Sequence, residues 1–101
     1  MTETPESYAD SFPDRLMEIA ANNPFVQLEI KREYAPLLAA DLYRGSVLMG
    51  HSDAPFEGSL GEALMKASQS EDVITLQLPA PMARTIAVQI KVGGIARRGL
   101  H

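Results

Sequence analysis

Apolar and polar residues alternate in some parts of this chain and recur at helical spacing in others. Over residues 11–24 the apolar side chains recur at i, i+3 and i+4 intervals, which is typical of an amphipathic helix. Ser11 can cap this helix and Pro13 suits its first turn, while two asparagines and Pro24 mark its end.

Alternation of period two predicts strands with one buried face. It occurs in three segments, which are residues 25–34, 72–79 and 82–92. The last two are separated only by a Pro-Ala-Pro connection, whose prolines cannot donate to a sheet ladder. We therefore expect residues 72–92 to form a C-terminal β-hairpin that ends at Gly93.

Two other segments complete the pattern. Residues 36–44 suit a short helix, with Pro36 in its first turn and Gly45 after its end, but a strand is the competing interpretation. Residues 46–50 are a short apolar strand candidate, and residues 59–70 have the capping-box spacing and apolar period of a helix.

This order of elements predicts an α+β fold. We expect a small, mostly antiparallel sheet of about four strands, with two or three helices packed on one face. The predicted domain covers residues 11–92, preceded by a flexible acidic arm at 1–10 and followed by a flexible basic tail at 93–101.

Length and composition change this picture little. The chain has 101 residues and no cysteine, which suits one domain and excludes disulfides, thiolate metal sites and cysteine nucleophiles. The acidic start does not resemble a signal peptide, and no apolar run is long enough to cross a bilayer. We therefore expect a cytoplasmic protein without a membrane partner.

The negative charge is concentrated near the start of the chain. Residues 1–18 carry five acids and one base, whereas the remainder carries eight of each. Binding to nucleic acid needs clustered basic residues on the fold, so a nucleic-acid partner is not expected. Arg97 and Arg98, on the predicted tail, would give only weak and salt-sensitive phosphate contacts.

The stretch between Ser46 and Gly58 holds the candidate chemistry. His51, Asp53 and Glu57 are weak candidates for acid–base work or for a mixed nitrogen and oxygen metal site. A nucleophilic Ser52 would need a downstream histidine, and the only one is His101. We favour a structural turn, and we expect no cofactor and no metal.

The function predicted from the sequence therefore depends on surfaces. The polar faces of the last two predicted strands carry almost no charge, which suits contact with another protein, although a helix of the same chain could cover this face instead. The predicted interface residues are Thr75, Gln77, Thr85, Ala87 and Gln89. We expect a non-enzymatic interaction module, self-associating or part of a larger assembly, of a small accessory or phage type. The alternative is a small enzyme or metal-binding protein using the histidine turn.

Overall fold

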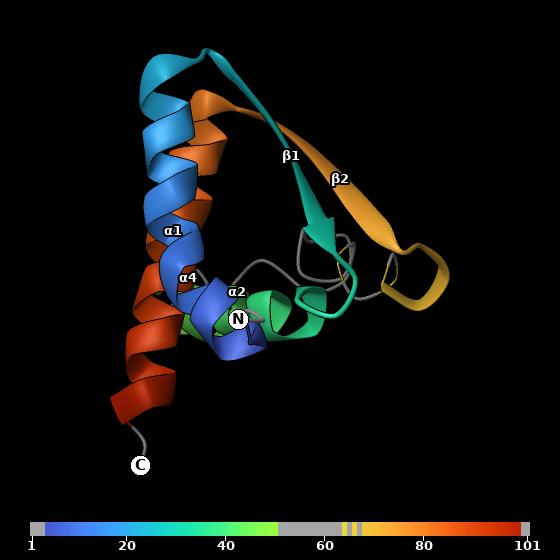
Figure 1. The fold of residues 1–101 in the computed structure, drawn as a ribbon. Coiled ribbons are helices and arrows are strands. Elements are labelled where there is room, and N and C mark those ends of the chain that lie inside the picture. Colours follow the sequence, from blue (N-terminus) through green and yellow to red (C-terminus); the bar gives the residue numbers. More distant parts are fainter. Residues whose placement is uncertain (1–3, 51–63, 65, 67, 100–101) are drawn as a thin grey trace.

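The computed structural model describes residues 4–50, 64, 66 and 68–99. Its elements, in chain order, are α1 (Pro5–Asn22), β1 (Phe25–Lys31), α2 (Ala35–Leu48), β2 (Val73–Pro79) and α4 (Ala80–Gly99), as drawn in Figure 1. Residues 64, 66 and 68–70 are also helical. They fall within the helix predicted over 59–70, of which the remaining residues lie outside the described part of the chain.

The fold pairs two helix–strand units that run in opposite directions (Figure 1). One unit is α1 followed by β1, and the other is β2 followed directly by α4. The α1–β1 turn lies against the junction of β2 and α4, where the backbone N–H of Ala80 donates to the carbonyl of Pro24 at 3.0 Å. As a result, α1 lies beside α4 and β1 lies beside β2, and α2 packs across α4.

The two strands form an antiparallel sheet with one buried face. In register, Val26 pairs with Leu78, Leu28 with Leu76 and Ile30 with Ile74. These side chains face the helices, whereas the residues between them are exposed. An isolated two-stranded sheet is marginal in water, so the helices that cover its apolar face are what stabilises it.

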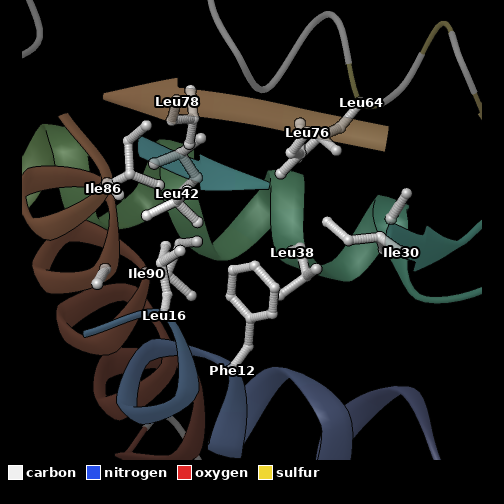
Figure 2. Packing of buried hydrophobic residues seen from close by; sticks show 14 of the residues in the cluster. Phe12, Leu16, Ile30, Leu38, Leu42, Leu64, Leu76, Leu78, Ile86 and Ile90 are labelled. Atoms are coloured by element: carbon white, nitrogen blue, oxygen red, sulfur yellow. The ribbon is translucent and has the colours of Figure 1, made fainter. Parts of the chain in front are cut away.

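The core lies between the helices and the inner face of the sheet (Figure 2). Leucines, isoleucines and alanines make up most of it. Its fully buried large side chains are Leu16, Val26, Ile30, Leu38, Leu64 and Ile90. Every described element supplies at least one core residue, which makes the described elements one packed unit.

Helix α1 begins six residues before the predicted start. Thr4 is its N-cap and accepts a hydrogen bond from the N–H of Ser7 at 3.1 Å, and Pro5 occupies the first turn. Pro13 lies inside the helix, where it is buried. Residues 5–10 are therefore helical, and Ala9 among them belongs to the core, in contrast to the predicted arm. The predicted end is correct, with both asparagines donating to helix carbonyls.

The predicted strand at 82–92 is wrong, and so is the C-terminal hairpin. These residues form most of α4. Alternation over this segment coincides with a second, helical pattern of buried residues, made by Ala83, Ile86, Ala87 and Ile90. The helix continues through Gly93 to Gly99, so residues 93–99 are also helical, unlike the predicted tail.

The prediction of a helix over 36–44 is confirmed, but the strand predicted at 46–50 is wrong. Helix α2 continues through Gly45 to Leu48, with Met49 as its C-cap, and the next residue, Gly50, has a φ of 77°, the left-handed conformation common after helix ends. The fold class is therefore α+β as predicted, with two strands among the described residues rather than four.

Helices α2 and α4 continue through Gly45 and Gly93, where the sequence suggested that they end, and these glycines lie at a close contact between the two helices. A Cβ on Gly45 would lie 1.6 Å from the carbonyl oxygen of Gln89, and one on Gly93 would lie 1.8 Å from that of Asp41. Glycine costs about 1 kcal/mol relative to alanine inside a helix. Here it allows the backbones of α2 and α4 to touch, and that contact is the crossing point of the two helices.

Candidate functional site

The residues of the candidate chemical turn lie outside the described part of the chain. These are His51, Ser52, Asp53 and Glu57, and the downstream His101 also lies outside it. Among the described residues, no group of three or more acidic, histidine or cysteine side chains could hold a metal ion. The candidate site is therefore built from the surfaces and clusters of the described helices and strands.

The five predicted interface residues do not share one face. Thr75 and Gln77 are exposed on the outer face of β2. Thr85 is exposed on α4 and Gln89 is half-buried there. Ala87 is 1% exposed and belongs to the core. The single uncharged face expected of a hairpin does not exist, because the second of its strands is a helix.

Contacts on two sides of α4 define its outer face. On one side Arg84, Lys91 and Arg98 contact α1. On another side Gln89, Gly93 and Arg97 contact α2. Thr85, Val88, Val92 and Ile95 lie on the remaining side of the helix, which we call the outer face of α4.

The outer face carries no charged residue. Val88 is 37% exposed and Ile95 is 54% exposed, while Val92 between them is half-buried. Positions 88, 92 and 95 are spaced i, i+4 and i+7, so they follow one another along the helix. Single exposed apolar residues are normal on a surface, whereas an aligned apolar stripe is typical of a contact surface.

Apolar residues at and just after the C-terminal end of α2 are exposed close to the crossing of α2 and α4. Val47, Leu48 and Met49 are all among the exposed large hydrophobic side chains. They follow Gly45, which contacts the backbone of Gln89, by two to four residues. Both helices therefore present apolar side chains within about one turn of the Gly45–Gln89 contact.

A row of basic residues borders the outer face on its α1 side. Arg84, Lys91 and Arg98 are spaced i, i+7 and i+14, and α4 contains no acidic residue at all. Lys91 pairs with Asp14 at 3.3 Å, and Arg98 pairs with Asp10. Arg84 differs from both, because its partner in the described part of the chain is the carbonyl oxygen of Ala20, at 3.4 Å.

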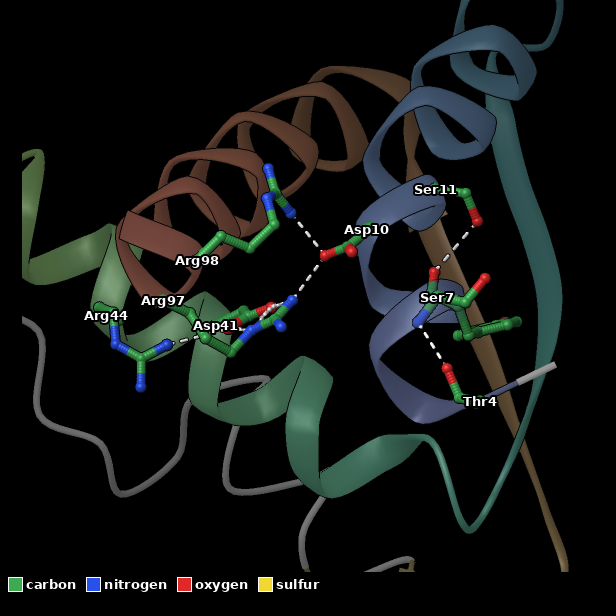
Figure 3. Close-up of polar contacts among 9 residues, drawn as sticks. Thr4, Ser7, Asp10, Ser11, Asp41, Arg44, Arg97 and Arg98 are labelled. Atoms are coloured by element: carbon green, nitrogen blue, oxygen red, sulfur yellow. Dashed lines mark hydrogen bonds and ion pairs between the residues drawn. The ribbon is translucent and has the colours of Figure 1, made fainter. Parts of the chain in front are cut away.

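A second feature is the buried charge cluster, in which three helices bring together five charged side chains (Figure 3). Its centre is Asp41, whose side chain is 0% exposed. Arg97 donates to both carboxylate oxygens of Asp41, with Nε–Oδ1 at 3.0 Å and Nη2–Oδ2 at 3.2 Å. Arg44 donates to the same Oδ1 at 3.0 Å. The cost of burying this carboxylate is offset because it is fully paired.

Arg97 also links the cluster to α1. Its Nη2 donates to Asp10 at 2.6 Å, and Arg98 donates to the same oxygen of Asp10. Burial alone would raise the pKa of Asp10, but the hydrogen bonds and charges of the two arginines hold it below its ordinary value. Hydrogen bonding to Asp41 raises the pKa of Arg97, with Asp10 adding to it, against the opposing effect of burial.

The cluster holds helices together rather than offering a reactive group. Asp41 has no exposed side-chain surface, so a bound molecule cannot reach it in this structure. Arg97 and Arg98, predicted as a free basic tail, are both engaged by carboxylates of the same chain. Sequence reasoning missed this cluster, although an aspartate within an apolar helix was the signal that could have found it.

A third feature of the described residues is a depression at the α1–β1 turn. It is lined by residues 20–24, Ala80, Pro81 and Arg84. The side-chain amides of Asn22 and Asn23 donate to carbonyls of α1, and Arg84 donates to another. The polar groups of the depression are thus bonded to the end of α1. They do not converge on a common point, as the polar groups of a ligand site do.

No protein-family model, curated protein or solved structure matches this chain. None of the helices in the described residues combines the length and apolar character that crossing a bilayer requires.

Proposed function

We propose that this protein is a non-enzymatic protein–protein interaction module, which associates with itself or belongs to a larger assembly. The observation that carries the proposal is the outer face of α4, a helix face with three aligned apolar residues and no charge. Val47, Leu48 and Met49, at and just after the end of α2, are further exposed apolar residues.

A comparison with the outer face of the sheet supports this choice of surface. On β1, Glu29 and Lys31 are exposed beside Gln27, so that face carries charges of both signs. Charge depletion distinguishes the core of a protein interface from ordinary surface. By this criterion the helix face suits a partner better than Thr75 and Gln77 of β2, which lie opposite Glu29 and Gln27 in the sheet.

We also propose that this module works in the cytoplasm as a small accessory or phage-type protein without a nucleic-acid partner. A cysteine-free chain of this size suits a reducing compartment. Four of the basic residues of α2 and α4 are paired with carboxylates of the same chain, which weakens them as phosphate ligands.

Site-specific photo-crosslinking tests the proposed surface. A benzophenone amino acid is placed at position 88 on α4 and, as a matched control, at position 27 on the exposed face of β1. We expect crosslinked protein species from position 88 and few from position 27, in the cells that express the protein and at raised concentration in solution. A protein that sediments as a monomer at all concentrations and forms no crosslink from either position would contradict the proposal.

A further inference from the structure

We propose that the outer face of α4 binds an amphipathic helix of another protein, whose apolar stripe is bordered by acidic side chains. This inference rests on the proposed function and specifies the partner. It is argued from the apolar stripe, from the basic row beside it and from the unequal pairing of the three bases in that row.

The stripe has the dimensions of a helix-binding surface. Val88, Val92 and Ile95 span about 10 Å along α4, given a rise of about 1.5 Å per residue. A partner helix would contact them through residues at i, i+3 or i+4, and i+7, which is the spacing used when amphipathic helices bind apolar surfaces. Val88 and Ile95, at the two ends of the stripe, are more exposed than Val92 between them, which is half-buried.

The charge beside the stripe specifies the partner further. Arg84, Lys91 and Arg98 are each within four residues of Val88 or Ile95, along the border between the outer face and the side of α4 that contacts α1. Asp14 and Asp10 neutralise the second and third of these bases. Arg84 has only a carbonyl partner in the described part of the chain, so its positive charge is not offset by a neighbouring carboxylate. The partner is therefore expected to place an acidic residue next to Arg84 and Val88.

The same charges disfavour two other occupants. A second copy would bring a second Arg84, whose charge is likewise not offset by a carboxylate of the described residues, so that two uncompensated positive charges would enter one interface. An anionic membrane would meet the carboxylates of Asp10 and Asp14 beside the row, and α4 has no aromatic residue for the lipid interface. An acidic amphipathic helix avoids both problems.

Fluorescence anisotropy with three synthetic helical peptides tests the inference. Each has about 15 residues and the same leucine stripe, and the positions flanking the stripe are all Glu, all Gln or all Lys. We expect the Glu peptide to bind the full-length protein most tightly, with a Kd about tenfold lower than that of the Lys peptide. Raising the salt concentration should reduce this difference, because exposed charges are screened.

Variants of the protein identify the surface. Val88→Gln should weaken binding of the Glu peptide about tenfold, whereas Met17→Gln, a matched change at a 39% exposed residue of α1, should leave it unchanged. Arg84→Glu should reverse the order of the Glu and Lys peptides. Arg84→Gln should abolish their difference, and it serves as a second variant should the charge reversal disturb folding.

Three outcomes would overturn the inference. The first is equal binding of the three peptides, or binding that Val88→Gln does not affect. The second is binding to phosphatidylcholine–phosphatidylserine vesicles that depends on Val88. The third is a dimer in sedimentation analysis that dissociates in Val88→Gln. Crosslinks from position 88 to a protein, without a preference for acidic peptides, would overturn this inference and leave the proposed function standing.

Discussion

Two sides of α4 carry out different tasks. The side that faces α2 is made of Gly93 and Arg97, which contact the backbone and the buried carboxylate of Asp41. The outer side is made of Val88, Val92 and Ile95, whose side chains are exposed or half-buried. The first side fits its neighbour closely and carries charge, whereas the second is apolar and uncharged. Stability should therefore depend on the charged side, and binding on the apolar one.

The largest effect is expected from Gly93→Val. The added Cβ would overlap the carbonyl oxygen of Asp41, which lies 1.8 Å from the ideal position and belongs to backbone that cannot rotate away. We expect a loss of about 4 kcal/mol or more in the free energy of unfolding, measured by urea denaturation. Overpacking usually costs about 1 kcal/mol or more. A free energy of unfolding within about 1 kcal/mol of wild type would therefore show that α2 and α4 do not touch at this point.

The next effect is expected from Arg97→Met. This change removes all three hydrogen bonds that Arg97 donates to the fully buried carboxylate of Asp41, and it leaves Arg44 as the remaining partner among the described residues. We expect a loss of about 3 kcal/mol in the free energy of unfolding. The double variant Asp41→Leu with Arg97→Met should recover part of this loss, because an apolar pair needs no charge compensation. A double variant less stable than Arg97→Met alone would contradict this account.

A smaller effect, with a defined pH dependence, is expected from Asp10→Asn. The pKa of Asp10 is lowered in the folded protein from its ordinary value of 3.8. The ionised carboxylate therefore stabilises the fold at pH values above that ordinary pKa. That contribution is lost as the pH falls through the lower folded-state pKa. Because Asp10 is more than a third exposed, we expect a loss below about 1 kcal/mol at neutral pH.

Urea denaturation at a series of pH values checks the sign of this dependence. The difference in stability between wild type and Asp10→Asn should shrink as the pH falls below 3.8. A difference that stays constant into the acid range would mean that Asp10 acts through packing rather than through its charge.

The smallest effect on stability is expected on the outer side of α4. Val88→Gln and Ile95→Gln replace exposed apolar residues by a residue of good helix propensity. We expect each to change the free energy of unfolding by less than about 0.5 kcal/mol in thermal or urea denaturation. Losses above about 1.5 kcal/mol would place these side chains in the core, and the difference between the two sides of α4 would then disappear.

The strands were predictable because each has one buried and one exposed face. In β1 the residues at 26, 28 and 30 are inward-facing as expected, and in β2 so are those at 74, 76 and 78. The end of α1 was also predictable, because asparagine and proline act locally. Its start was not recognised, although Thr4 and Pro5 are a local cap and first-turn signal.

The misassignment of α4 has a specific cause. Residues 82–92 satisfy the strand period and the helical period at once, and their β-branched residues favour the strand. Pro81 in the first turn and the helical spacing of the alanines pointed to the helix instead. The candidate surface depended on this choice, because a strand would place Val88 and Val92 on its apolar face with Met82 and Ile90, whereas the helix aligns them with Ile95 on its outer face.

The sequence by itself determined the α+β class, the buried faces of the two strands and the presence of a helix at α1, and it favoured a helix over a strand at α2. Those features follow from side-chain periodicity and from local capping, which act over a few residues. The tertiary structure alone decided that Gly45 and Gly93 lie inside helices, that Asp41 is buried with Arg97, and that α4 has an outer face. Each of these depends on a contact between residues more than forty positions apart, for which a local pattern carries no signal.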